Sequence, residues 1–312
     1  MESIIFVHKG NDFYLHLAVK QAIRTNPTIK VILLGDESNK NVEGACHFLI
    51  SDYFKRAEAL SEIYVHHSPN GVAYELFCFQ RWLVIWEFMQ KHPEYDDRFV
   101  YCDSDTLLFS DVKEDLNQLG NHPLGLENGL CPAFTFFNKG TLSEICTTIE
   151  GFYNTEVGKQ YWQFFVDQTI RENKIFGFSD MYAFEYYGKF IRKGEVVNLD
   201  IPQKDLQAKN AVYSCYDQSI NLSDGFETDK NGKKNIKWKQ GIPYCYSCLL
   251  KKDVRFKGIH FQGRDKFLMA KALKEPIFSL KGDWKRAYLR YRLQNVSWLI
   301  RLYAVLKKSM TS

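Results

Sequence analysis

The sequence is poor in proline and has no long apolar run. Its 312 residues include only 8 prolines, and no stretch approaches roughly 18 uninterrupted apolar residues, so we expect neither collagen nor a membrane-spanning helix. Residues 1–7 lack both a basic segment and a long apolar one, so we expect no signal peptide. The net charge of +4 is too small to indicate nucleic-acid binding by itself.

The eight cysteines include one CxxC pair and no second pair. Most of them lie in apolar runs such as residues 77–79, where a free thiol packs as a small hydrophobic group. We therefore expect Cys245 and Cys248 to lie in a packed strand or turn and not to bind zinc. We predict a cytoplasmic protein in a reducing compartment.

The chain has no internal repeat, no low-complexity tract and no linker rich in proline and glycine. This predicts one continuous α/β domain, residues 1–275, and a helical tail, residues 276–312. Strands and helices alternate in the first third, which indicates βαβ units and a largely parallel sheet with ligands at the carboxyl ends of its strands. The expected strands are residues 3–7, 30–34, 46–50 and 98–102, and the expected helices are residues 14–23, 54–65 and 74–90.

The rhythm changes after Asp111. The Asn231-Gly232 pair predicts a two-residue hairpin between residues 226–228 and 235–238. The other strands that we expect are residues 124–127, 133–137 and 195–199, and the helices are residues 141–153, 162–172 and 179–187.

The sharpest pattern is an apolar strand that ends in two carboxylates, Phe99-Val100-Tyr101-Cys102-Asp103-Ser104-Asp105. Side chains two residues apart lie on the same side of an extended chain, and two like charges so close are costly unless a cation lies between them. Hard divalent ions bind carboxylate oxygens together with substrate phosphates. The pattern favours a metal site, and a polar turn at the end of a strand is the alternative.

Two classes of enzyme have an apolar strand that ends in DxD. One is the phosphoaspartate hydrolases, in which the first aspartate of DxDx[TV] is a nucleophile. Here Thr106 comes one position too early for that motif, and Asp103 follows several strands. The other class is the nucleotide-sugar glycosyltransferases of the GT-A fold, in which DxD ends a middle strand. The position of Asp103 in the chain fits the second class better.

A second pattern lies later in the chain, at His260-Phe261-Gln262-Gly263-Arg264-Asp265-Lys266. A borderline metal accepts an imidazole beside carboxylates. Glycine lets the backbone approach a phosphate closely, and lysine offers it a point charge. A lone histidine after an apolar residue is more often structural, but histidine, glycine and lysine within seven residues are more specific.

Together, HFxGxxK and the central DxD resemble the family 8 glycosyltransferases of bacterial lipopolysaccharide synthesis and their relatives. The resemblance covers residues 1–270 and implies a GT-A fold, which is an α/β fold with a Rossmann-like nucleotide-sugar-binding mixed sheet. It implies that Asp103, Asp105 and His260 hold Mn²⁺ or Mg²⁺ and that Lys266 contacts the diphosphate. The family continues with Pro-Trp after the lysine, whereas this chain has Phe267-Leu268.

The resemblance extends to two places between these motifs. The segment Tyr74–Leu83 resembles the helix before DxD, whose arginine, here Arg81, reaches the donor sugar; a plain surface arginine is the alternative. Asp167-Gln168 resembles the family's DQ pair beside the anomeric carbon, and would be catalytic; two polar residues on an amphipathic helix are the alternative. The implied donor-binding set is His8, Arg81, Asp103, Ser104, Asp105, Gly263 and Lys266.

Residues 281–312 carry eight Lys and Arg against one Asp, Asp283, a net charge of 8 − 1 = +7. Aromatic and leucine side chains follow helical spacing between these charges. A basic amphipathic helix of this kind suits an anionic membrane surface, and a helix docked on the domain is the alternative. We expect the protein at the inner face of the cell membrane.

These patterns predict a metal-dependent glycosyltransferase. We expect it to move a hexose from a nucleotide sugar, UDP-hexose, to a glycan or lipid-linked glycan in surface polysaccharide or lipopolysaccharide synthesis. The resemblance implies retention at the anomeric carbon. The rivals are a metal-dependent phosphatase with Asp103 as nucleophile and a non-catalytic protein that binds glycans or membranes.

Overall fold

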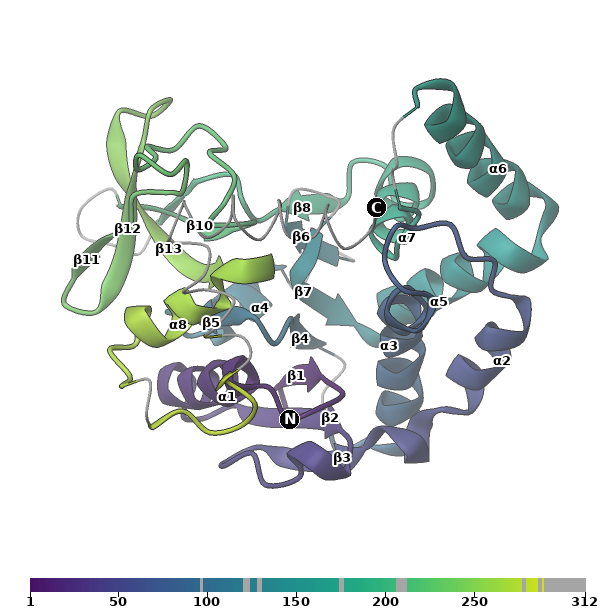
Figure 1. Ribbon diagram of the computed structural model, residues 1–312, viewed down its shortest axis with the longest axis horizontal. Coiled ribbons are helices and arrows are strands. Elements are labelled where there is room, and N and C mark those ends of the chain that lie inside the picture. The colour runs from purple at the N-terminus through teal and green to yellow at the C-terminus, as the bar shows by residue number, and fades with distance from the viewer. Residues whose placement is uncertain are drawn as a thin grey trace, which may run out of the picture.

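The computed structural model describes residues 1–95, 98–119, 124–127, 131–173, 177–205, 212–276, 279–285 and 288. Two β-sheets form the centre of the protein, and helices flank the larger sheet (Figure 1). The helices are α1 (Phe13–Thr25), α2 (Lys55–Ile63), α3 (Val72–Lys91), α4 (Lys113–Leu119), α5 (Lys139–Asn154), α6 (Glu156–Arg171), α7 (Met181–Tyr186) and α8 (Phe267–Ala272).

The larger sheet has seven strands in the order β3-β2-β1-β4-β7-β6-β8. The first four run parallel, whereas β7 is antiparallel to both β4 and β6. The order 3-2-1-4 is that of a Rossmann-type half, so the expected α/β fold with a mixed sheet is confirmed. At the far edge of the sheet, β6 and β8 again pair parallel. The strands are β1 (Ser3–Val7), β2 (Lys30–Gly35), β3 (Cys46–Leu49), β4 (Arg98–Cys102), β6 (Leu124–Glu127), β7 (Cys131–Asn138) and β8 (Val196–Asn198).

The parallel strands β1, β2 and β4 are buried on both faces, which is why they are almost continuously apolar in the sequence, whereas the edge strand β3 is only partly buried. Because side chains alternate along a strand, Ile4 and Phe6 of β1 pack into one core while Ile5 and Val7 pack into the other. The first core is shared with α1 and the smaller sheet. The second core is shared with α2, α3, α5 and α7.

The smaller sheet has the order β11-β12-β13-β10-β9, and β5 also pairs with β13. Since β5 starts directly after Asp105 and runs antiparallel to β13, it ties the end of β4 to the smaller sheet. In this register Thr106 lies opposite His260, so the two sequence patterns meet. The strands are β5 (Thr106–Leu108), β9 (Gln203–Asp205), β10 (Val212–Asp217), β11 (Lys237–Lys239), β12 (Ile242–Ser247) and β13 (Lys252–His260).

The hairpin predicted around Asn231-Gly232 is wrong in its strands. Thr228 and Lys234 form only an isolated bridge across that turn. Residues 237–239 instead form β11, which pairs with β12 across a turn at Gln240-Gly241, where both residues have positive φ. A hairpin alone is marginally stable, whereas β11 extends a sheet in which β12 is already paired with β13.

The C-terminal tail is described only at residues 276, 279–285 and 288. There the Asp283 N–H donates to the Asn11 carbonyl at 2.7 Å, and Trp284 and Tyr288 pack, partly buried, against the core. The rest of the predicted basic helix lies outside the described residues, so the helix and the boundary at residue 275 stay predictions. Among the described residues, no helix combines the length and apolarity needed to cross a membrane.

Candidate functional site

The two carboxylates of the DxD pattern lie in a tight turn between β4 and β5. The Asp103 N–H donates to the Ala133 carbonyl of β7 at 2.9 Å, which extends the pairing of β4 by one residue. The Asp103 carbonyl accepts from the N–H of Thr106 at 3.1 Å and from its hydroxyl at 2.7 Å. Thr106 therefore closes the turn that presents both carboxylates at the carboxyl edge of the parallel strands.

The end of β13 meets this turn from the other sheet. The Phe261 N–H donates to the Asp105 carbonyl at 2.9 Å, and His260 Nε2 lies 3.3 Å from Asp105 Oδ1. His260 Nδ1 lies 2.7 Å from the Gln218 carbonyl. A carbonyl only accepts hydrogen bonds, so Nδ1 carries a proton and Nε2 is the nitrogen that faces the carboxylates.

These residues fit a divalent cation. One ligand atom from each of Asp103, Asp105 and His260 lies within 4.8 Å of the other two, and no other such group of three occurs in the described part of the chain. Two carboxylates with one imidazole suit Mn²⁺ or a similar ion. The bond from His260 Nδ1 to a backbone carbonyl is the kind of outer contact that orients a ligating histidine.

Two cationic groups, His260 and Lys266, lie beside the Asp105 carboxylate. Burial would raise the pKa of the Asp105 carboxyl, but His260 and Lys266 outweigh it and hold the pKa well below its usual range. Burial would likewise lower the pKa of His260, but the neighbouring Asp105 carboxylate outweighs it and raises that pKa. Lys266 Nζ lies 3.1 Å from Asp105 Oδ2. The carboxylate thus already attracts two cationic groups, as a metal ligand does.

Arg81, on α3, clamps the other carboxylate. Its guanidinium donates to Asp103 Oδ1 at 2.6 Å, to the Tyr101 hydroxyl at 2.7 Å and to Asp180 Oδ2 at 2.7 Å. Burial would lower its pKa, but Asp180, Tyr101 and Asp103 raise it further. Arg81 is therefore not a plain surface arginine, and it fixes one oxygen of Asp103 in place.

Asp180 was missed in the sequence. Its carboxylate accepts from Arg81 and also from Trp82 Nε1 at 2.8 Å, and it is 3% exposed. It stands directly before α7, where an aspartate commonly caps a helix, so its position carried no separate signal. Its side chain makes no capping hydrogen bond, because it is turned toward Arg81.

The predicted catalytic pair is not brought to this cluster. Asp167 and Gln168 are exposed on α6, and each bonds a residue one turn away on or just past its own helix, Gln163 for Asp167 and Glu172 for Gln168. These contacts match the amphipathic-helix alternative. The catalytic assignment of the pair stays a prediction.

The first loop joins the site through His8. His8 Nδ1 lies 2.9 Å from the Ser104 hydroxyl, and His8 Nε2 lies 3.2 Å from Asp12 Oδ2. The Tyr14 hydroxyl also donates to Asp12, at 3.0 Å. The ammonium of Lys266 lies 4.3 Å from the centre of the Tyr14 ring. The loop after β1, the DxD turn and the segment after β13 thus form one continuous polar surface.

Gly263 has a local role in bringing Lys266 back to this surface. Its φ is +68°, which is left-handed backbone that favours glycine, and open space surrounds the position of a Cβ. The glycine therefore permits the turn out of β13, and steric crowding does not require it. Its predicted contact with the donor stays a prediction.

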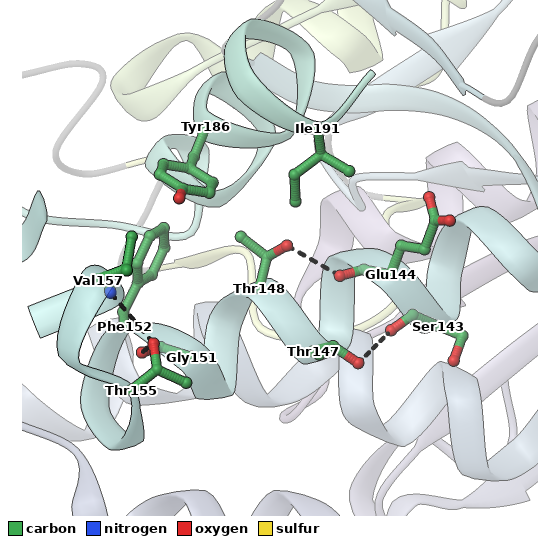
Figure 2. A pocket seen from close by; sticks show the side chains of 11 residues that line it. Ser143, Glu144, Thr147, Thr148, Gly151, Phe152, Thr155, Val157, Tyr186 and Ile191 are labelled. Atoms are coloured by element: carbon green, nitrogen blue, oxygen red, sulfur yellow. Dashed lines mark hydrogen bonds between the residues drawn. The ribbon is translucent and has the colours of Figure 1, made fainter. Parts of the chain in front are cut away.

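A separate groove lies between α5, the start of α6 and α7, with a volume of about 350 Å³ (Figure 2). The hydroxyls of Thr147 and Thr148 donate to carbonyls one turn earlier on α5, at Ser143 and Glu144. The Glu144 carboxylate is paired with Arg192 at 2.7 Å. None of the lining residues belongs to the polar cluster, so the groove offers no free charged group for catalysis.

The CxxC pair lies apart from this cluster, on β12 and in the turn after it. Burial raises the pKa of Cys245 to about 11, so its thiol stays protonated, and it donates to the Glu227 carbonyl. Cys245 lies in β12, and Cys248 is exposed in the turn that follows. The expected packed strand and turn are confirmed.

Comparison with known proteins gives structural likeness without an assignable family. No protein-family model matches the sequence, and no curated protein matches it. Mouse xyloside xylosyltransferase 1 in its apo form is 10% identical, with a TM-score of 0.45 over 64% of this chain and 86% of that one. The galactosyltransferase LgtC, in complex with donor and acceptor sugar analogues, is 14% identical, with a TM-score of 0.34 over 64% of this chain and 73% of that one.

A third similar structure is the bifunctional glycosyltransferase WbbM in its apo form. It is 10% identical, with a TM-score of 0.46 over 93% of this chain and 51% of that one. This chain thus spans about half of that protein. Identities and TM-scores this low do not assign a family, so the functional conclusion below depends on the site itself.

Proposed function

We propose that this protein is a metal-dependent glycosyltransferase that moves a hexose from a nucleotide sugar, UDP-hexose, to a hydroxyl of a glycan acceptor. The observation that carries the proposal is the convergence of Asp103, Asp105, His260 and Lys266 at the carboxyl edge of the parallel strands. Ligands of open α/β sheets bind at this edge. Three ligands of this type with an adjacent ammonium suit a metal-bound diphosphate.

Asp103, Asp105 and His260 would hold the ion, Mn²⁺ or Mg²⁺. When bound, it acts as a Lewis acid on the donor's diphosphate. The side chain of Lys266 is 27% exposed, so its ammonium can turn from Asp105 to a phosphate oxygen and stabilise the leaving diphosphate. Gly263, in the turn before it, leaves the backbone open to the same phosphates.

The remaining polar groups would bind the rest of the donor. His8 of the first loop and Ser104 of the DxD turn lie within hydrogen-bond distance of each other and would contact the nucleoside. Arg81 and Asp180 form a fixed pair beside the metal ligands, and we propose that they hold hydroxyls of the transferred sugar. The resemblance gives Asp167, with Gln168, a catalytic role beside the anomeric carbon, and that assignment stays a separate prediction.

The finer features of the reaction rest on the sequence resemblance. They are retention at the anomeric carbon, a role for Gln168 beneath that carbon, and a lipid-linked glycan acceptor in surface polysaccharide or lipopolysaccharide synthesis. The basic tail, residues 281–312, would hold the protein at the anionic inner face of the cell membrane. Deleting the tail should weaken binding to anionic liposomes, and unchanged binding would refute this attachment.

The direct test is a thermal-unfolding screen of nucleotide sugars with and without Mn²⁺, followed by assay of donor hydrolysis. A ligand at 100 times its Kd stabilises the native state by about 2.7 kcal/mol, which is enough to raise Tm. Because the proposed donor binds through the metal, it should raise Tm only when Mn²⁺ is present. In Asp105→Asn, the donor with Mn²⁺ should no longer raise Tm, while the protein stays folded.

The rivals give different results in the same experiment. The phosphatase would form a phosphoaspartate at Asp103, detectable by mass spectrometry, without any nucleotide sugar. The non-catalytic binding protein would show no Mn²⁺-dependent hydrolysis of any donor. Full affinity of Asp105→Asn for the donor in the presence of Mn²⁺ would also reject the proposed metal site.

A further inference from the structure

A lysine is buried behind the metal-facing end of the smaller sheet. The Lys234 side chain is 1% exposed, whereas lysine is almost never fully buried unless paired. Its ammonium donates to Asp217 Oδ1 at 2.6 Å, to Asp224 Oδ2 at 2.8 Å and to the Ser219 carbonyl at 3.0 Å. All three of its hydrogens are therefore used.

The acceptors of Lys234 share one segment, residues 217–224, which begins with the last residue of β10. The Lys234 N–H also donates to the Ile220 carbonyl of this segment, at 2.9 Å. Burial would lower the pKa of Lys234, but the Asp217 and Asp224 carboxylates outweigh it and raise the pKa, so the group stays charged. One residue thus fixes a whole turn through four hydrogen bonds.

The same turn bonds both the side chain and the backbone of His260. Its Gln218 carbonyl accepts from His260 Nδ1 at 2.7 Å, and its Ile220 N–H donates to the His260 carbonyl at 3.0 Å. Among the described residues, the Lys234 ammonium makes no hydrogen bond to His260. It bonds the two residues on either side of Gln218, namely Asp217 and Ser219. The position of the Gln218 carbonyl therefore depends on Lys234.

We infer that Lys234 is a positioning residue for the metal centre: it fixes the turn whose Gln218 carbonyl directs His260 Nε2 toward Asp105. This inference rests on the proposed function, in which His260 is a metal ligand. Loss of the ammonium would release the turn and let the imidazole rotate or change its tautomer. Removing an outer contact of a ligating histidine typically lowers metal affinity about 10- to 100-fold.

Lys234→Met alone would leave Asp217 buried without its cation and could unfold the protein, so the test uses a second variant as well. Lys234→Met/Asp217→Asn removes both charges of this ion pair. Circular dichroism checks that the double variant is folded. We expect the Kd for Mn²⁺, measured by calorimetry, to rise about 10- to 100-fold in the double variant. A folded double variant with the Mn²⁺ affinity of the wild type would overturn the inference.

The chain offers a control pair that joins β13 of the same sheet to helix α4. Lys257 of β13 is ion-paired with Asp115, which also accepts from the Tyr216 hydroxyl at 2.6 Å, and none of these contacts involves residues 217–224. Lys257→Met/Asp115→Asn should disturb stability comparably and leave Mn²⁺ affinity unchanged. Equal loss of affinity in both double variants would mean a general loss of sheet stability, and the positioning role would be wrong.

A second readout separates this inference from the proposed function. In ¹⁵N-histidine-labelled protein without metal, the His260 Nδ1 proton should resonate downfield and exchange slowly, because it is bonded to a buried carbonyl; a His260→Gln variant assigns it. The signal should vanish in the Lys234 double variant and persist in the Lys257 double variant. If the wild type binds no Mn²⁺, the metal function fails, but this signal still decides whether Lys234 positions His260.

Discussion

The larger sheet holds its site residues through charged side chains, whereas the smaller sheet holds His260 mainly through backbone groups. On the first side, a chain of charge-assisted bonds runs from Asp103 through Arg81 to Asp180 and ends at Trp82. On the second side, the Gln218 carbonyl bonds the imidazole of His260, and the Ile220 N–H bonds the His260 backbone carbonyl.

The difference predicts how each half of the site fails. Removing a charge from the first half leaves buried carboxylates without a partner, which mainly costs stability. Shifting the second half by a fraction of an ångström leaves the fold in place but misdirects a ligand. Substitutions in the two halves should therefore differ in whether they lower the free energy of unfolding or the affinity for the metal.

Arg81→Met should have the largest effect, and the effect should be on stability. The substitution leaves Asp180 and Asp103, which have side chains 4% and 20% exposed, without the cation that they share. Breaking one partner out of a buried ion pair costs about 3–5 kcal/mol. Urea unfolding followed by circular dichroism measures this free energy.

Arg192→Met is the control, because Arg192 pairs with Glu144 at the protein surface. A solvated pair of this kind contributes little, so the unfolding midpoint should not move measurably. If Arg81→Met unfolds like the wild type, the ionic chain does not hold the first half of the site together.

Gly258→Ala should have an intermediate effect that reaches both sheets. A Cβ at this position of β13 would lie 2.6 Å from Phe134 Cζ on β7 and 2.9 Å from Tyr216 Cδ1 on β10. Both rings are buried, and overpacking of this kind costs about 1–3 kcal/mol. Because His260 is two residues away, Mn²⁺ affinity should fall as well.

The comparison variant is Gly71→Ala, since no atom lies within 4 Å of a Cβ at Gly71. We expect wild-type Mn²⁺ affinity there. Wild-type affinity in Gly258→Ala, despite a loss of stability, would show that the second half tolerates displacement and that the two halves of the site do not differ in this way.

The same contrast explains what the sequence could predict. The parallel half was predictable because its strands are apolar on both faces and end in polar residues, so β1 to β4 and the DxD turn followed from pattern alone. His260 was found through its neighbours Gly263 and Lys266. The pairing of β5 with β13, which brings the patterns together, spans some 150 residues and has no local signal.

Two residues of the site could not have been found from the sequence. Lys234 lies in a run with Lys230, Lys233, Lys237 and Lys239, and a lysine-rich run normally indicates a solvated surface. Only tertiary packing distinguishes the buried member from the exposed ones. Asp180 is likewise one aspartate among many, and its role depends on Arg81, 99 positions away.

Lys266→Met should have the smallest effect on stability and two opposite effects on ligands. The Lys266 side chain is partly exposed, and His260 still pairs with Asp105 after the substitution, so the loss should cost no more than about 1 kcal/mol. The ammonium now lies 3.1 Å from a carboxylate that would bind the metal, so its removal lifts a like-charge repulsion, and Mn²⁺ should bind a few-fold more tightly, about 2- to 5-fold. UDP in the presence of Mn²⁺ should bind about 10-fold more weakly, because a charge-assisted contact to the diphosphate is lost.

Calorimetric titration of each ligand, with the surface variant Lys20→Met as control, checks both signs. Parallel loss of Mn²⁺ and UDP binding would place Lys266 among the groups that hold the metal site together, and not among those that face the diphosphate.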